Sequence, residues 1–283
     1  MIPVGGQAWS WDPVTDLQQM WAFPFMVNAF RAGTIVAVAA AVVGWFTVLR
    51  RQSFAGHTLA VVGFPGAAGA TLVGVSASYG YFAFCVSAAV VIGMIPRDAD
   101  GHESALTGTI QAFLLACGFL FAALYKGLLG GVTALLFGSF LGITATQVWM
   151  LLAVASAVLA LLAAIGRPLL FASIDPDVAA GRGVPVRLLG LVFLVLLGAA
   201  VAGASQITGS LLVFALLVMP AATAQTLTAS PRLGLALSVL IALVVTWAGL
   251  IAAYYTPYPI GFYVATFAFT GYVLALTGRR ALA

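Results

Sequence analysis

Long apolar runs, each about the length of a bilayer crossing, alternate along the chain with short segments rich in Arg, Asp, Gly and Pro. A membrane-spanning helix needs about 20 largely apolar residues. The pattern predicts an all-α, polytopic membrane helix bundle with nine spans, or eight because the second and third runs are short. The runs cover residues 31–50, 57–75, 80–96, 105–126, 147–166, 187–204, 207–229, 233–254 and 259–277.

The stretch 127–146 is also apolar, but it is rich in glycine. We expect it to form a short helix packed at the outer surface of the bundle rather than a further span. It is therefore left out of the count of spans.

The composition agrees with a membrane bundle. The 283 residues are 63% hydrophobic and 6% charged, with a mean hydropathy of +1.15, whereas about a quarter of the residues in a soluble domain are charged. The net charge of +4 is too small and too scattered to indicate nucleic-acid binding. Cys85 and Cys117 lie in apolar runs without CxxC spacing, which favours helix packing over a disulfide or a metal site.

The basic residues predict the orientation in the membrane. If the N-terminus is outside, only Arg31 and Lys126 fall at outer boundaries, as the positive-inside rule requires. We therefore predict a cytoplasmic (inner) membrane protein with an external N-terminal segment (1–30), one transmembrane domain (31–278) and a cytoplasmic C-terminus. The basic residues on the cytoplasmic side are then Arg50, Arg51, Arg97, Arg167, Arg182, Arg187, Arg232, Arg279 and Arg280.

The acidic residues limit the sources of energy. None lies within a predicted span, although intramembrane carboxylates commonly serve as proton or ion relays. The chain also lacks a GxxxxGK[ST] loop for ATP. A transport subunit driven by a partner is therefore favoured over a self-sufficient channel or secondary carrier. An intramembrane enzyme is disfavoured as well, because no HExxH motif occurs and no GxSxG motif stands out.

The longest cytoplasmic loop, 167–186, contains the signals of a short helix. Asp175 can cap its N-terminus, Pro176 suits its first position, and Asp177 favours the positive end of the helix. Glycines follow and offer a left-handed stop. The pattern predicts an exposed helix on the inner face, either a docking element for a cytoplasmic protein or an ordinary surface turn.

Four stretches together resemble a known family. FAGHTLAVVGFPGAAGA (54–70) is similar to the family pattern F-x-G-D-x-x-S-H-x-x-L-P-G, and LLFGS (135–139) resembles the next family block. SIDPDVAAGRGVPVRLL (173–189) and ITGSLLVFALLVMPAATAQTL (207–227) resemble its cytoplasmic loop and the following span. The family is the permease subunit of ABC importers for zinc and manganese, and the likeness runs from about residue 30 to 278.

The resemblance implies an architecture and a set of partners. Such permeases are similar to those of type II ABC importers and work as two copies, with two cytoplasmic ATP-binding subunits and an extracytoplasmic metal-binding protein. It implies that the chain holds no cofactor and that Zn²⁺ first, or Mn²⁺ next, is the transported substrate; a non-metal or chelated-metal cargo is the alternative. The likeness places these residues in the coupling helix that meets the ATPase: Asp175, Pro176, Asp177, Ala180 and Gly181.

The chain departs from the family pattern at two positions that resemble metal ligands. When the stretches are aligned from Gly56 and Pro65, the family aspartate falls on His57 and the family histidine on Val61. Imidazole suits zinc better than manganese. Pro65 lacks an N–H, so the Val61 carbonyl loses its helical partner one turn from His57. We hypothesise a transient metal site here in the translocation path; the alternative is a hydrogen-bonded helix-end histidine beside a simple kink.

A second proline interrupts the run LLVMPAATA. Pro220 frees the Leu216 carbonyl by the same reasoning, which predicts either a hinge or plain helix packing at this point. Thr223 and Gln225 follow it and are candidates for lining the inner vestibule.

The segment RDADGHES (97–104) contains residue types that bind metals: Asp98, Asp100, His102 and Glu103. It lies in a predicted cytoplasmic turn, where a solvated polar loop is expected. The alternative is a metal site that captures the ion at the exit.

Overall fold

The computed structural model describes residues 18–94, 102–125, 135–138, 142–210 and 213–282, and within these residues the fold is all-helical, as the sequence predicts. The helices are α2 (Pro24–Leu49), α3 (Ser53–Leu72), α4 (Ala77–Met94), α5 (His102–Leu124), α7 (Ala145–Ile174), α8 (Pro176–Gly181), α9 (Val186–Thr208), α10 (Val213–Leu227), α11 (Pro231–Tyr255) and α12 (Ile260–Leu282).

Each of the nine predicted spans falls on one of these helices. Seven of the helices in the described part of the chain are long and apolar enough to cross a membrane. The other two are α3 and the 15-residue α10, and both contain an internal proline and are largely buried. The predicted polytopic bundle is confirmed.

Several helix boundaries differ from the prediction, and two of them involve prolines. α2 begins at Pro24, seven residues before the expected start of the first span, because proline is favoured in the first turn of a helix. α7 continues through Pro168 to Ile174, so the expected loop 167–186 is helical over its first half. Proline removes one hydrogen bond from α7, but the buried side chains of Leu169 and Ala172 hold its last turns against the bundle.

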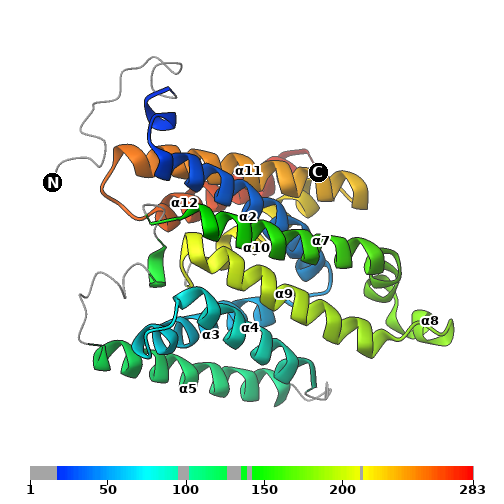
Figure 1. The fold of residues 1–283 in the computed structure, drawn as a ribbon. Coiled ribbons are helices and arrows are strands. Elements are labelled where there is room, and N and C mark those ends of the chain that lie inside the picture. Colours follow the sequence, from blue (N-terminus) through cyan, green and yellow to red (C-terminus); the bar gives the residue numbers. More distant parts are fainter. Residues whose placement is uncertain (1–17, 95–101, 126–134, 139–141, 211–212, 283) are drawn as a thin grey trace.

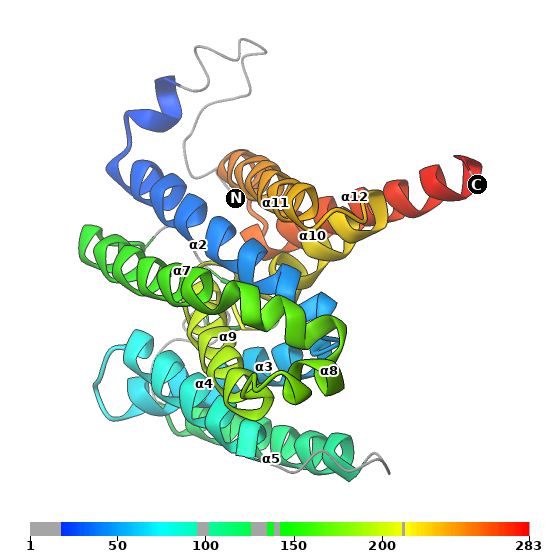
Figure 2. The same ribbon diagram turned by 90° about the vertical axis from the view of Figure 1, so that its right-hand side faces the viewer.

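The helices form three groups across the bundle. α2, α7 and α9 lie in the middle, α3, α4 and α5 on one flank, and α10, α11 and α12 on the other (Figures 1 and 2). The short helix α8 projects from one end of the bundle, beyond the end of α7 (Figure 1). We refer to this end as the α8 end.

Glycines allow the closest approaches between helices. A Cβ atom on Gly66 of α3 would overlap the carbonyl oxygen of Gly80 in α4, and one on Gly44 of α2 would overlap the backbone of Leu217 in α10. Membrane helices use small residues in this way to bring their backbones together. These contacts fix α3 against α4, and α2 against α10.

Residues 135–138 lie against the end of α9, whereas most of the stretch 127–146, with its expected outer helix, lies outside the described residues. The carbonyl oxygen of Leu135 accepts hydrogen bonds from the Tyr81 hydroxyl at 2.8 Å and the Ser210 backbone N–H at 3.2 Å. Gly138 and Gly209 meet backbone to backbone, and both have a positive φ, +81° and +76°. Only glycine adopts this conformation without strain, so two turns far apart in the sequence interlock.

Candidate functional site

The helix predicted in the cytoplasmic loop is present as α8. The Asp175 carboxylate accepts a hydrogen bond from the Val178 N–H at 2.9 Å, Pro176 occupies the first turn, and Asp177 lies beside it. Only Ala179 is buried, so the rest of α8 faces outward. Asp175, Pro176, Asp177, Ala180 and Gly181 therefore form one projecting surface.

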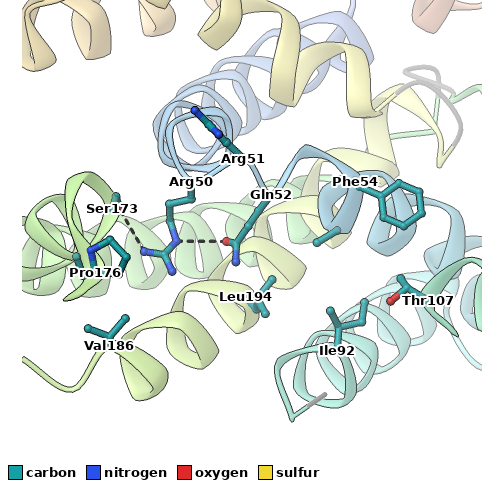
Figure 3. A pocket seen from close by; sticks show the side chains of 12 residues that line it. Arg50, Arg51, Gln52, Phe54, Ile92, Thr107, Ser173, Pro176, Val186 and Leu194 are labelled. Atoms are coloured by element: carbon teal, nitrogen blue, oxygen red, sulfur yellow. Dashed lines mark hydrogen bonds between the residues drawn. The ribbon is translucent and has the colours of Figure 1, made fainter. Parts of the chain in front are cut away.

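Arg50 connects this surface to the rest of the bundle. It follows the last residue of α2 and donates through Nη1 to the Ser173 hydroxyl of α7 at 3.1 Å, and through Nε to the Gln52 side-chain oxygen at 3.3 Å (Figure 3). Its guanidinium carbon also lies 5.4 Å from the ring centre of Phe193 in α9. Because Ser173 is two residues before Asp175, one side chain joins the base of α8 to the α2–α3 turn and to α9.

A cavity of about 410 Å³ opens beside this arginine (Figure 3). Its lining includes Arg51 and Gln52 from the α2–α3 turn and Phe54 from the start of α3, together with Pro176 from α8. The cavity also reaches Ile92 of α4. The α8 end thus has a hollow in which six helices and the α2–α3 turn meet, because the lining also includes residues of α5, α7 and α9.

His57 lies on α3, one turn beyond the start of the helix, and is half-buried. Its ring packs edge to face against Phe214 of α10, with ring centres 5.4 Å apart. Val61 is 4% exposed, and Pro65 lies buried within an unbroken helix. The structure thus brings α3 and α10 together at His57, and the transient metal site hypothesised there stays a prediction.

On the other side of α3, polar and close contacts join it to α5. The Thr58 hydroxyl donates to the side-chain oxygen of Gln111 at 2.8 Å. A Cβ atom on Gly118 would lie 3.0 Å from the Cα of Pro65, so α5 packs closely against α3 at the proline. The bend-prone part of α3 is therefore held between α10 and α5.

The α10 candidates make different contacts. Pro220 is buried within the helix. The Thr223 hydroxyl donates to the Met219 carbonyl of its own helix at 2.7 Å, whereas the Gln225 amide donates to the Trp45 carbonyl of α2 at 2.8 Å. Gln225 also lines a second cavity of about 370 Å³. The predicted vestibule and hinge roles stay predictions.

The segment RDADGHES falls partly outside the described residues. Asp98 and Asp100 lie outside them, while His102 and Glu103 begin α5 without described side chains. Within the described part of the chain, no three His, Cys, Asp or Glu residues are grouped as metal ligands would be. The exit site proposed from the sequence therefore stays untested.

Arg50 and the cavity beside it were missed by sequence reasoning. The sequence marked Arg50 only as an indicator of membrane orientation. Its partner Ser173 is 123 positions away, and no local pattern predicts that distance. The sole available signal was an arginine immediately after a span, next to a loop with helix-capping residues.

Sequence comparisons place these features in a known group. The profile described as the ABC 3 transport family matches residues 22–279. The chain is 28% identical to the manganese transport system membrane protein MntC of Halalkalibacterium halodurans over 210 residues, which cover 74% of this chain and 72% of the relative. It is 30% identical to the manganese import system permease protein ScaB of Streptococcus parasanguinis over 211 residues, covering 75% and 74%.

Solved structures share the fold. A chain in the structure of PsaBC from Streptococcus pneumoniae in complex with Fab superposes with a TM-score of 0.83 at 26% identity, covering 93% of this chain and 95% of that one. A putative metal-chelate type ABC transporter in an inward-facing conformation superposes with a TM-score of 0.75 at 18% identity, covering 98% of this chain and 93% of that one. This second likeness supports the fold alone. The helical bundle of the described residues, the projecting α8 and the match over nearly the whole sequence lead to one conclusion: this chain belongs to the ABC 3 transport family.

Proposed function

We propose that the chain is the permease subunit of an ATP-driven importer for a divalent metal ion. Two copies would span the membrane, with ATP-binding subunits on the α8 end and a metal-binding protein at the opposite end. In this arrangement the α8 end faces the cytoplasm and the N-terminus lies outside, as the distribution of basic residues predicts. The observation that carries the proposal is α8 itself.

α8 has the properties of a docking element. It is short, capped by Asp175 and almost entirely exposed, so it contributes little to the core of the bundle. Its base is nevertheless linked through Ser173 and Arg50 to the turn before α3. A force applied to α8 by a partner would therefore reach the helix that carries His57.

For the cargo we propose manganese before zinc. The two relatives described above are named for manganese transport. Those names give no support to the expectation of zinc before manganese, which the imidazole at position 57 suggested. A half-buried histidine still offers one nitrogen ligand. Single-ligand contact is weak, and weak contact suits an ion that must leave the path again.

A chelated metal is the second candidate. At the two positions that match ligands of the family pattern, the chain has a histidine packed on Phe214 and a buried valine. An aromatic ring and an aliphatic side chain suit the organic part of a chelate better than a bare ion. This candidate keeps the same fold and the same partners.

Uptake by cells lacking their own manganese importer tests the proposal. Cells that express the complete transporter should accumulate radioactive Mn²⁺, and His57→Ala should reduce the initial rate severalfold. The chain alone in vesicles, without nucleotide, should accumulate nothing. Accumulation there would overturn the proposal, and uptake restricted to a chelate would select the second candidate.

A further inference from the structure

We propose that the α8 end carries a binding site for one anionic phospholipid, between α3, α4 and α5. Two neighbouring cavities carry the inference. The polar one, of about 410 Å³, and an apolar one, of about 180 Å³, share Ile92 and Thr107 as lining residues. The polar and the apolar cavity thus adjoin at these two side chains. This arrangement fits the headgroup and one acyl chain of a lipid.

The polar cavity is suited to a phosphate. Arg50 and Arg51 line it, and the lining residues that the structure describes include no carboxylate. Gln52 precedes the first turn of α3 without a capping hydrogen bond from its side chain, and this end of a helix attracts anions. Since Arg50 is engaged with Ser173 and Gln52, the exposed side chain of Arg51 is the group that meets the phosphate.

The tight turn between α2 and α3 sends the two arginines in different directions. Arg51 has a φ of +55°, and its N–H donates to the Val48 carbonyl at 3.0 Å. Arg50 points toward Ser173, while Arg51 lies at the end of α2 (Figure 3). One arginine therefore holds helices together, while its neighbour stays exposed and is still among the residues that line the cavity.

The apolar cavity is suited to a hydrocarbon chain. Val62, Phe84, Val91, Ile110 and Leu114 line it. Two of its polar lining residues are satisfied elsewhere, because the Thr58 hydroxyl donates to Gln111 and the Ser87 hydroxyl to the Ala83 carbonyl. Methyl and aromatic groups therefore face the occupant.

The depth of the site matches a lipid. Arg51 lies just beyond the C-terminal end of the apolar helix α2. Val62 lies nine residues into α3 from Ser53, or about 14 Å further along the helix axis at a rise of about 1.5 Å per residue. The apolar cavity therefore extends from the headgroup level into the hydrocarbon region, where a free phosphate has no reason to reach.

Native mass spectrometry of the full-length protein, purified with any subunits that accompany it and stripped of lipid, tests the site. Phosphatidylglycerol, phosphatidylcholine and inorganic phosphate are titrated separately. We expect one phosphatidylglycerol per chain, bound about fivefold more tightly than phosphatidylcholine, which is the contribution of about one basic residue at a membrane surface. Inorganic phosphate should neither bind nor compete.

Paired variants separate the two halves of the site. Arg51→Gln should abolish the preference for phosphatidylglycerol, whereas Arg232→Gln, an exposed arginine at the start of α11, should leave it unchanged. Val91→Trp should weaken the binding of both phospholipids about tenfold. Val244→Trp, which alters a comparably exposed valine on α11 (57% against 50%), should weaken neither.

Three results would overturn the proposal. The first is equal binding of the two phospholipids by the unmodified protein, and the second is competition by inorganic phosphate, which would indicate a simple anion site. The third is a Val91→Trp variant that no longer forms a dimer but binds lipid as before. That result would mean that the second copy of the chain, and not a lipid, covers the groove.

Discussion

The guanidinium of Arg50 and the hydroxyl of Ser173 lie 3.1 Å apart and form a hydrogen bond between residues 123 positions apart. Ser173 belongs to the last turn of α7, directly before α8, and its own hydroxyl donates to the Leu169 carbonyl. Arg50 directly follows α2 and begins the turn into α3. The bond therefore joins the projecting helix to the helix that carries His57.

Arg50→Lys should uncouple transport from ATP hydrolysis. Lysine keeps the charge but lacks the planar fork that reaches Ser173 and Gln52 together while stacking on Phe193. The assembled transporter should still hydrolyse ATP, while metal uptake falls about tenfold, corresponding to the loss of about 1.4 kcal/mol of linkage. Both rates are measured in proteoliposomes with Arg232→Lys as control. Equal uptake by the two variants would show that the linkage is not needed.

Asp175 offers a test of α8 that separates shape from charge. Asp175→Ala removes the acceptor for the Val178 N–H and should cost about 1 kcal/mol of helix stability. Asp175→Asn keeps the cap. Hydrogen exchange in residues 176–181 should therefore rise in the alanine variant alone, together with weaker binding of the ATP-binding subunit. If the asparagine variant is equally impaired, the ATP-binding subunit recognises the charge of the carboxylate itself.

His57→Asp should move cargo preference toward manganese. The change restores the residue type that the family pattern has at this position and supplies oxygen ligands, which Mn²⁺ prefers to imidazole. Competition between Mn²⁺ and Zn²⁺ in whole-cell uptake should shift severalfold in favour of Mn²⁺. His57→Gln is the matched control, since it offers an uncharged amide oxygen. An unchanged ratio in both variants would place selection on the external binding protein.

Gly138→Ala should destabilise the protein far more than Gly183→Ala. The two glycines have nearly the same φ, +81° and +82°, so the backbone strain of alanine is similar. A Cβ atom at 183 meets nothing within 4 Å, whereas at 138 it overlaps the Ile207 carbonyl. We expect the Gly138 variant to lose about 2 kcal/mol more, seen as a lower midpoint in thermal unfolding in detergent. Similar midpoints would mean that the two turns separate easily.

The sequence predicts the helices of this fold well but not their contacts. Hydropathy places all nine spans because each apolar run must satisfy its backbone within the membrane. α8 is predicted from Asp175 onward because capping and proline signals act over a few residues. The course of α7 past Pro168 depends on buried neighbours, which no local signal records.

The candidate site divides in the same way. His57, Val61 and Pro65 could be singled out because a short pattern carries them. The contact of His57 with Phe214, the bond between Arg50 and Ser173, and the meeting of Gly138 with Gly209 depend on packing across the bundle. Such pairs become visible only once the chain is folded.

The internal prolines have a consequence for how the molecule can move. Pro65 and Pro220 weaken α3 and α10, which are largely buried and meet at His57 and Phe214. The third internal proline, Pro168, lies beyond the predicted span of α7. The two helices that proline weakens are therefore largely buried among straighter neighbours, and bending confined to them changes little of the surface that the protein presents to the surrounding lipid.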